Sequence, residues 1–596
     1  MRMGGHKGGP YIFKNNEMRK KYLLFLILLM AIQIGVNFNL KAQSLPVGIP
    51  GLEDAYRRAQ LLGLVDSSTS FCARPFFPTL SLQTKDGFDP FNTLDSNRFT
   101  KFNGIFKLGG DKILIKLLPV TMINQYNSKH PEGLNDGAMI PSRGFQTMIS
   151  AGVYAQYGPL SIQLRPEIVS AANQDYEGFP HRTDPAVDAH LWYEMYYSNF
   201  NRIDLPERFG EKSYNRIFWG QSSIRLTNGP ISLGVSTENL WWGPGLRNSL
   251  VMTNNAPGFT HFTFNTVKPI KTYIGSFEGQ IIAGRLNNSG FYPPDTTLNY
   301  QGGPQFYQAK PNDWRYINGI VLSYQPKWVP GLFLGGTRTF QVYEKSMGNS
   351  LGNMNIGDIL PIFTTFAAGK YKDGVLQARK REQLMSFFMR WVWLKANGEV
   401  YFEYGRKDYF WNIQDLEVEP SYSGAYILGF RKLMPFLSRK NEYIQVTLEL
   451  TQLAMSPTTT NRNGTSWYLS DIVKAGYTNQ GQLLGAGIGP GSNSQTLNVS
   501  WVKGVKQLGI QLERFVHNND YQHFPIGDIR NHWVDLSATI NGNWDYKNLV
   551  FSATLGFVNS LNYEWLFDAP PPPAFFTTKG NDVFNLHSQF GLTYRF

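Results

Sequence analysis

The chain has 596 residues, one cysteine and a formal net charge of +12; aromatic residues make up 15%, charged residues 17%, and 58 residues are glycine. Residues 1–42 hold seven of the 56 Lys and Arg and one of the 44 Asp and Glu, so the remainder carries +6. This charge is too mild for a nucleic-acid-binding face. The single Cys72 excludes an internal disulfide and is expected to be a half-buried thiol without a catalytic role.

The N-terminus has the pattern of a secretory signal peptide. Three basic residues at 19–21 precede the apolar run YLLFLILLMAIQI at 22–34, which is shorter than the ~20 residues that a spanning helix needs. A small residue, Ala42, stands before Gln43, and we expect cleavage between them. The alternative for this run is a membrane anchor.

Residues 43–105 are expected to form a helical periplasmic segment and lead-in. The stretch GLEDAYRRAQLLGLVD at 51–66 predicts its helix, because apolar residues recur at i, i+3, i+4 and i+7. They are Leu52, Ala55, Tyr56 and Ala59, with Arg57, Arg58 and Gln60 on the opposite face. A lone helix cannot bury such a stripe, so it is expected to pack against the periplasmic mouth of a larger body.

Residues 106–596 predict an all-β transmembrane domain, a closed antiparallel β-barrel of the bacterial outer membrane. After the signal peptide no run is apolar and long enough for a membrane helix, and the chain is aromatic-rich, glycine-rich and helix-poor. The stretch NEYIQVTLELTQL at 441–453 alternates apolar with polar residues, as a strand between lipid and a polar lumen does, although a β-sandwich alternates similarly. At ~9–11 residues per spanning strand, the length fits roughly 16 to 20 strands.

The stretch FFMRWVWLKANGEVYFEYGRK at 387–407 predicts a hairpin that turns at Asn397-Gly398. Its aromatic residues fit a girdle at the membrane interface, or alternatively ordinary cross-strand packing. They are Trp391, Trp393, Tyr401, Phe402 and Tyr404.

The last ten residues, HSQFGLTYRF, predict the final strand. Phe590, Leu592, Tyr594 and Phe596 share one face. A last strand that ends in phenylalanine, with Tyr594 two residues before it, resembles the recognition strand of bacterial outer-membrane barrels. The resemblance implies two partners, outer-membrane lipid and the barrel assembly machinery. Both termini are then expected in the periplasm, and the four prolines at 570–573 in the last external loop, because prolines cannot continue a sheet.

The sequence carries few marks of catalysis. It lacks H-E-x-x-H and G-x-S-x-G, and GAGIGPG at 485–491 lacks the Gly-Lys-Ser/Thr ending of a phosphate loop, so it is expected to be a flexible loop. No cofactor, metal or catalytic residue is predicted. A hydrolase with a dispersed Ser/His/Asp site stays open, because such triads are recognised by geometry rather than spacing.

The middle of the chain carries a family resemblance. Within residues 213–258 a strand pair leads into Trp241-Trp242-Gly243-Pro244-Gly245, then Ser249-Leu250 and Asn254-Asn255-Ala256-Pro257. This run resembles the core motif of the Wzi-type capsule assembly family. The segments 56–66, 329–340, 404–430 and 481–494 are similar to further parts of that family, so the resemblance covers most of the mature chain. Leu246-Arg247 departs from the aromatic or acidic pair expected in enterobacterial relatives, which puts transfer of their sugar specificity in doubt.

The resemblance implies an outer-membrane barrel of about eighteen strands that binds secreted capsular polysaccharide or exopolysaccharide and ties it to the cell surface, without a cofactor or covalent chemistry. A monomer is expected. The competing functions are a transport channel, either porin-like or plugged, and an outer-membrane hydrolase.

The Trp-Trp motif is the candidate binding site. Pro244 cannot donate a ladder hydrogen bond, so the strand is expected to end there and the chain to turn into the lumen. Adjacent residues on a strand point to opposite faces, so one tryptophan would brace the wall. The other would contact saccharide, with Arg247, Asn254 and Asn255. The alternative is that both Trp241 and Trp242 are packing or interface residues.

Overall fold

The computed structural model describes residues 43–94, 99–100, 102–110, 112–179, 189–347, 381–407, 417, 423–456, 466–523, 532–565 and 580–596. The predicted signal peptide with Ala42 and the prolines at 570–573 lie outside these residues. Gln43, on the mature side of the predicted cleavage point, is buried. No helix among the described residues is long and apolar enough to cross a membrane.

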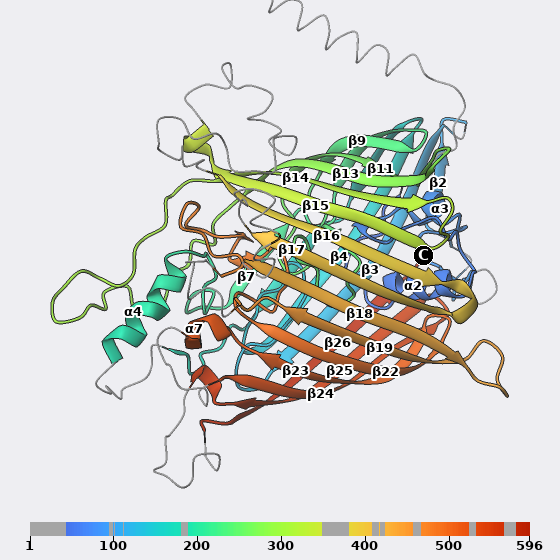
Figure 1. Ribbon diagram of the computed structural model, residues 1–596. Coiled ribbons are helices and arrows are strands. Elements are labelled where there is room, and N and C mark those ends of the chain that lie inside the picture. Colours follow the sequence, from blue (N-terminus) through green and yellow to red (C-terminus); the bar gives the residue numbers. More distant parts are fainter. Residues whose placement is uncertain are drawn as a thin grey trace, which may run out of the picture.

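The described strands form a closed antiparallel barrel with eighteen spanning strands, which confirms the predicted fold class and strand number (Figure 1). Two of the eighteen spanning strands are interrupted, and each of these consists of two shorter strands. The last strand of the chain pairs with the first spanning strand and so closes the barrel. The first half of the wall contains β3 (Ile113–Asn127), β4 (Gly144–Tyr157), β5 (Leu160–Leu164) with β6 (Glu167–Ala171), β7 (Tyr214–Phe218) with β8 (Ser223–Asn228), β9 (Ile231–Ser236), β11 (His261–Thr266), β12 (Ile270–Lys271) beside β13 (Gly275–Leu286), β14 (Arg315–Pro326) and β15 (Leu332–Tyr343). The second half contains β16 (Glu382–Trp393), β17 (Gly398–Lys407), β18 (Gly424–Pro435), β19 (Tyr443–Gln452), β22 (Asn493–Lys503), β23 (Lys506–Val516), β24 (Val534–Tyr546), β25 (Leu549–Leu561) and β26 (Val583–Tyr594).

The two ends of the barrel differ. Short turns, such as 158–159, 229–230, 504–505 and 547–548, lie at one end together with the C-terminus; we refer to it as the turn end. The long connections lie at the other, the loop end, with α4 (Ala189–Phe200), α7 (Asn519–His523) and the short 3₁₀ helices η2 (Glu344–Met347) and η6 (Tyr563–Trp565). The small hairpin of β2 (Ile105–Leu108) and β3 extends the wall at the turn end.

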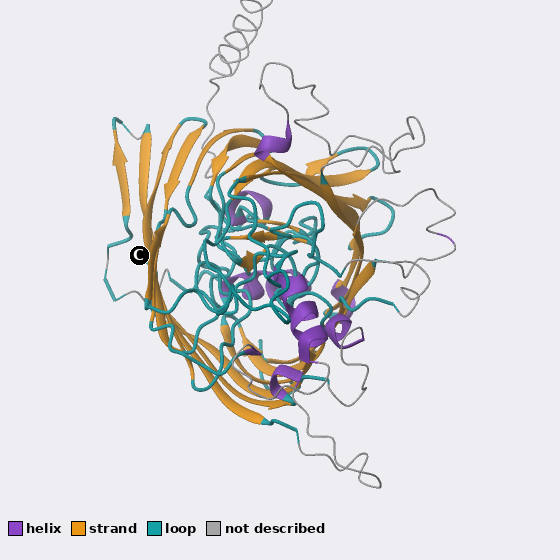
Figure 2. Cartoon of the chain, turned by 90° about the vertical axis from the view of Figure 1, so that its left-hand side faces the viewer, coloured by secondary structure: helices purple, strands orange, loops and turns teal. Residues whose placement is uncertain are grey.

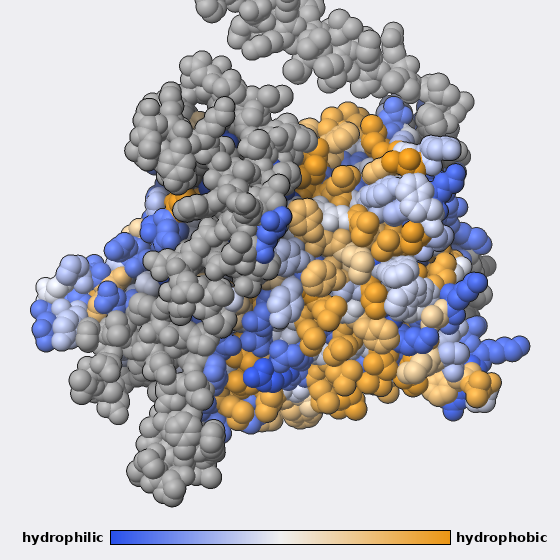
Figure 3. All heavy atoms as spheres, in the orientation of Figure 1, coloured by the Kyte–Doolittle hydropathy of each residue, from blue (hydrophilic) through white to orange (hydrophobic). Residues whose placement is uncertain are grey.

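Alternating side chains give the wall an apolar outer band, visible in Figure 3, and a polar inner face. In β19 the leucine and valine side chains point outward, whereas Gln445 and Glu449 point inward and are buried. The predicted hairpin is present and turns through η4 (Leu394–Ala396) and Asn397, whose φ is 48°. Trp391, Trp393 and Phe402 are exposed on the outer face, as the aromatic girdle requires.

The girdle prediction is wrong for Tyr401. This residue lies on the inner face of β17 and is fully buried, and its hydroxyl donates to Glu449 at 2.7 Å. It differs from Phe402 because neighbouring residues on a strand point to opposite sides of the wall.

The predicted final strand is present as β26. It pairs with β25 and closes the barrel against β3. Its outward side chains include Phe590 and Tyr594, while Arg595 points inward and donates to the carbonyls of Phe88 and Lys547, each at 3.1 Å. The C-terminal strand therefore also holds residues that fill the lumen.

The N-terminal segment 43–94 lies inside the barrel at its turn end, where Figure 1 labels α2 and α3 near the C-terminus, and Figure 2 shows the lumen filled by helices and loops. It contains α2 (Leu52–Leu61), β1 (Ala73–Arg74) and α3 (Pro78–Ser81). The predicted apolar stripe of α2 is buried, and so is the opposite face with Arg57, Arg58 and Gln60. The helix is thus enclosed on both faces, because its polar side also meets the polar inner wall.

Two long connections from the loop end, 237–260 and 466–492, fold back into the lumen and complete the plug. They contain β10 (Trp241–Trp242), β20 (Thr478–Asn479) and β21 (Gln482–Leu483). The expectation of a flexible loop at 485–491 is wrong: Ala486 and Ile488 are buried in the central apolar cluster, and a Cβ on Gly485 would lie 2.5 Å from the Leu250 carbonyl. Cys72 joins the same cluster and is fully rather than half buried.

Candidate functional site

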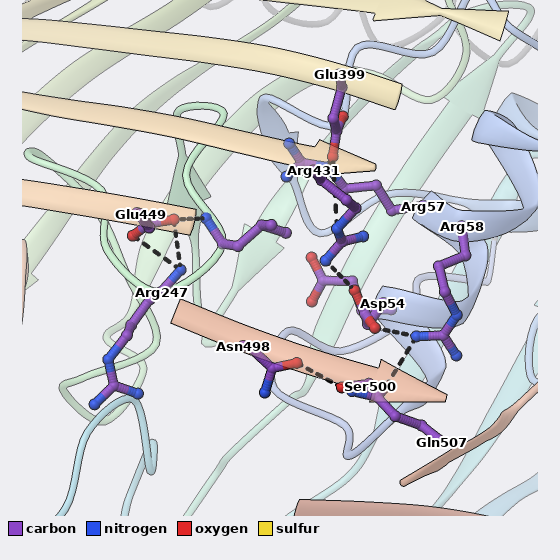
Figure 4. Close-up of polar contacts among 12 residues, drawn as sticks. Asp54, Arg57, Arg58, Arg247, Glu399, Arg431, Glu449, Asn498, Ser500 and Gln507 are labelled. Atoms are coloured by element: carbon purple, nitrogen blue, oxygen red, sulfur yellow. Dashed lines mark hydrogen bonds and ion pairs between the residues drawn. The ribbon is translucent and has the colours of Figure 1, made fainter. Parts of the chain in front are cut away.

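Ionic contacts hold the plug to the inner wall. In α2, Arg57 donates to Glu399 of β17 at 2.9 Å and to the Pro244 carbonyl at 2.7 Å, so one guanidinium joins the helix, the wall and the Trp-Trp connection (Figure 4). Asp54 bonds to Arg431 and Arg58. Burial alone would raise the pKa of Asp54, but these arginines outweigh it and lower the pKa to about 2. The plug is therefore fastened by charges on both partners.

The Trp-Trp motif is part of this plug. As β10 it pairs with β1, Trp241 opposite Arg74 and Trp242 opposite Ala73. Trp242 is 0% exposed; its indole N–H donates to Gln280 of β13 at 2.9 Å, and its ring reaches the place where a Cβ on Gly319 would lie. Trp242 thus fills the space between the plug and β13–β14.

Trp241 points the other way but is also covered. Arg74 lies over its ring with 4.5 Å between the guanidinium carbon and the ring centroid, and 4% of the residue remains exposed. The predicted turn after Pro244 is present: the backbone N–H groups of Leu246 and Asn248 each donate to Glu449 at 2.8 Å. Leu246 and Arg247 are held here through their backbone N–H groups, so the contact with Glu449 does not depend on which side chains occupy these two positions.

The other three residues of the predicted binding site, Arg247, Asn254 and Asn255, line two different cavities. Arg247 donates to Glu513 at 2.8 Å, and both line a polar cavity together with Trp241 and Asn254. Asn254 donates to the Asn135 carbonyl at 2.8 Å. Asn255 instead lines the second cavity. The structure therefore brings Trp241, Arg247 and Asn254 together and keeps Trp242 and Asn255 apart from them.

The polar cavity has a volume of about 490 Å³ and lies between the plug and the wall β18–β26. Amide and hydroxyl side chains of successive strands form its outer side, and Trp241 is its single aromatic residue among the described lining. The strand side chains include Gln445, Thr447, Thr496, Asn498, Gln511, Ser537, Thr539, Asn541, Asn543, Thr554 and Gln589. It is a space suited to water and hydrogen-bonding solutes.

The second cavity lies at the loop end, has a volume of about 350 Å³ and is rich in aromatic side chains; we refer to it as the aromatic cavity. The size is within the ~300–1,000 Å³ of small-ligand pockets. Its aromatic lining is Tyr176, Tyr196, Phe200, Phe515, Trp533, Tyr563 and Trp565. Glu132, Gly133 and Asp136 line both cavities, so the connection 128–143 forms the junction between them.

One wall of the aromatic cavity is a stack of rings at the ends of β23–β25. His517 lies between Phe515, at 3.9 Å, and Trp533, at 3.8 Å between ring centroids. Trp533 meets Tyr563 and Trp565 edge to face. Asp535 fixes the stack, since its two carboxylate oxygens bond to His517 at 2.6 Å and to the Trp533 indole at 2.9 Å. Trp533 remains half-buried and presents an oriented platform.

The backbone beside this stack is strained. Glu564 and Trp565 both have φ of 57°, the left-handed region that costs side-chain-bearing residues about 1–3 kcal/mol each. The conformation directs both side chains into the cavity lining. Such strain concentrates at ligand sites, where the surrounding structure holds it in place.

A Ser–His contact lies at the edge of the aromatic cavity, because His130 lines the cavity and Ser560 does not. His130 Nε2 is 3.0 Å from the Ser560 hydroxyl, and His130 stacks on Tyr563. Ser560 is fully buried, so its oxygen cannot meet a ligand in the cavity. No group of three or more His, Cys, Asp and Glu suited to a metal ion occurs among the described residues.

Comparison with protein families decides the relationship that the motif suggested. The sequence model of the family described as capsule assembly protein Wzi matches residues 125–559, more than half of the chain. The chain belongs to the Wzi capsule assembly family. A comparison with curated proteins finds no match.

This Wzi-family chain is also similar to solved structures. One is Wzi of Escherichia coli, described as an outer-membrane protein involved in group 1 capsule assembly and a carbohydrate-binding β-barrel; identity is 14%, coverage 80% of this chain and 84% of the other, and the TM-score 0.49. Another is OccAB2 of Acinetobacter baumannii, with 10% identity, coverage of 80% and 97%, and a TM-score of 0.36. At these values the likeness carries no functional argument.

The sequence did not reveal the aromatic cavity of this Wzi-family chain. Its residues come from 130–141, 176, 196–207, 255, 481–489, 515–517 and 533–565, and they meet only because the barrel closes and the loops fold inward. The signal present in the sequence was the combination of aromatic and acidic residues just beyond strand ends, as in Tyr563-Glu564-Trp565 after β25.

Proposed function

We propose that this chain is an outer-membrane lectin-like barrel that binds capsular polysaccharide or exopolysaccharide at its loop end and helps to assemble or anchor the polymer at the cell surface, without catalysis. The aromatic cavity is the observation that carries the proposal, together with membership of the Wzi capsule assembly family.

The chemistry of the cavity suits sugars. Pyranose rings present apolar C–H faces that stack on aromatic rings and hydroxyls that need hydrogen-bond partners. Trp533 supplies an oriented half-buried platform, and Glu207 and Asn255 supply polar groups in the same lining. The polar cavity below offers amides and hydroxyls, with Arg247 and Asn254 as candidate contacts for a polymer segment that reaches it.

The proposed orientation follows from the plug. The turn end, with the C-terminus and α2, faces the periplasm, and the loop end faces the medium. In this arrangement the aromatic cavity is on the side where secreted polymer accumulates, and a monomer suffices for binding.

The test measures how much polysaccharide stays bound to cells of a deletion strain, and of the same strain that expresses the wild-type protein or a variant. Trp533→Ala is expected to shift polysaccharide from the cell-bound to the released fraction. The matched control is Trp328→Ala, which removes an exposed tryptophan at the turn end. Wild-type retention by a correctly inserted Trp533→Ala protein would refute the proposed site, and unchanged retention in the deletion strain would refute the function.

A second candidate function is a transport channel. The observation that favours it is the junction at Glu132, Gly133 and Asp136, where the polar and aromatic cavities meet and together extend from the plug helix to the loop end. Purified protein in a planar bilayer distinguishes the two: steady ion conductance supports the channel, and its absence supports the anchor.

A further inference from the structure

The aromatic cavity has an acidic lining. Four carboxylates, Glu132, Asp136, Glu207 and Glu564, line it with His130 and His517, and none of the described lining residues is Lys or Arg. The rest of the mature chain is mildly basic, so this lining departs from the general charge of the protein.

Two of these carboxylates lack a cationic partner among the described residues. Asp136 accepts from the neutral amides of Gln125 and Gln589, each at 3.0 Å. Glu132, at the junction of the cavities, accepts no hydrogen bond on its carboxylate within the described part of the chain. The carboxylate of Glu132 is thus available to a cation, whereas both oxygens of Asp136 already accept hydrogen bonds from neutral amides.

The nearest arginine does not offset this charge. Arg247 is already paired with Glu513, so the two together are close to neutral. Burial, with Asp535, Glu513 and Asp136 nearby, raises the pKa of Glu132, so a positive group beside it would also favour its ionised form. A positive group placed beside Glu132 would relieve this repulsion, whereas another anion would add to it.

We propose that the aromatic cavity selects sugar residues that carry a protonated amine and rejects those that carry an acid group. The inference rests on the proposed polysaccharide-binding function and names the class of polymer that the site takes.

The aromatic wall favours the same ligands as the carboxylates do. An ammonium group is attracted to the face of a tryptophan or tyrosine ring, and this attraction strengthens where water is excluded. Trp533 and Tyr176 are half-buried in the same lining as Glu132 and Asp136. A uronate would bring a fifth carboxylate into a space of about 350 Å³ without a described cation to receive it.

The test is binding of three oligosaccharides of equal length to the purified full-length protein in detergent. The probes are glucosamine oligomers, their N-acetylated forms and galacturonate oligomers, measured by calorimetry near neutral pH. The expected order of affinity is amine, then N-acetyl, then uronate, and added salt is expected to weaken the first.

Variants locate the effect at the cavity. Glu132→Gln keeps the shape of the side chain and is expected to lower amine affinity roughly tenfold, the value of one charge-assisted contact, while raising uronate affinity. Glu132→Lys is expected to bind uronate oligomers more tightly than amine oligomers. Partial unfolding cannot produce this reversal, because it would weaken the binding of both. Glu344→Gln removes an exposed carboxylate elsewhere at the loop end and is expected to change nothing.

The outcomes separate this inference from the proposed function. Tighter binding of uronate than of amine oligomers overturns the charge selection and leaves polysaccharide binding intact. An amine preference that Glu132→Gln and Glu132→Lys leave unchanged overturns the assignment to this cavity. Absence of binding by all three oligomers overturns the inference, and polymer retention on cells then decides separately whether the proposed function stands.

Discussion

Replacement of Trp242 by alanine tests whether the Trp-Trp motif fastens the plug. The side chain is completely buried between β10 and the strands β13–β14, with Leu250 and Ile282 in the same apolar cluster. Its removal leaves a cavity against a wall that cannot collapse, because the β-ladder fixes the positions of Gln280 and Gly319.

The expected loss of unfolding free energy in Trp242→Ala combines two contributions. Removal of a fully buried tryptophan side chain costs about 3–5 kcal/mol. The side-chain amide oxygen of Gln280 also loses its donor, the Trp242 indole at 2.9 Å, which adds about 1 kcal/mol. Trp242→Phe keeps most of the packing but not the hydrogen bond, so its unfolding free energy is expected to fall by less than half of the loss in Trp242→Ala.

The assay is equilibrium unfolding in detergent by guanidinium chloride, followed by far-ultraviolet circular dichroism. Protease cleavage within 237–260 provides a second readout, because loss of the Trp242 packing is expected to expose this connection. Trp328→Ala, at an exposed turn-end position, is expected to stay within about 0.5 kcal/mol of wild type. If Trp242→Ala keeps the wild-type unfolding free energy and resists protease equally well, the bracing role is refuted.

Four further predictions concern the plug, its charges and assembly. Glu399→Gln leaves arginines buried without a counter-charge, so the unfolding free energy should fall by about 3–5 kcal/mol; a loss below 1 kcal/mol would contradict a closely coupled network. The pKa of Asp54 in the folded protein is about 2, below its ordinary value of 3.8, so the ionised carboxylate stabilises the fold at neutral pH and this contribution is lost as pH falls from about 4 to 2. Asp54→Asn should therefore remove about 2 kcal/mol at pH 7 and flatten the unfolding profile in that window, and an unchanged profile would refute the pairing. A cysteine at the exposed turn-end residue Leu64 should react with impermeant thiol reagents only after the outer membrane is permeabilised, and labelling of intact cells would reverse the orientation. Deletion of Phe596 should reduce heat-modifiable barrel in the outer membrane, with normal assembly counting against its role in recognition.

The barrel itself could be predicted from the sequence because its determinants are local. Side chains alternate with a period of two, so β19 and β26 show which residues face lipid and which face the lumen. The same alternation separates Tyr401 from Phe402, but the girdle prediction grouped them by residue type rather than by face. The range of 16 to 20 strands followed from length, because a spanning strand has a nearly fixed length, and the family resemblance implied about eighteen.

The contents of the lumen depended on contacts that the sequence does not encode locally. The stripe on α2 predicted that the helix packs, but not that Arg57 would reach Glu399, which is 342 positions away. Likewise, the run at 485–491 has the composition of a mobile loop, yet its small residues allow close approach to Leu250 in a buried plug. Proximity here is created by barrel closure and by two connections that fold inward.

The candidate site divides in the same way. Composition and motif pointed to Trp241 and Trp242 and to a polysaccharide-binding family, because the turn at Pro244 and the adjacent rings are consecutive in the chain. Whether a ring is a brace or a platform depends on what covers it, and tertiary packing buried both tryptophans while leaving Trp533 half-exposed. The aromatic cavity and its acidic lining were decided only by the tertiary structure, because residues as distant as Glu132 and Trp533 meet when the loops of a closed barrel converge at one end.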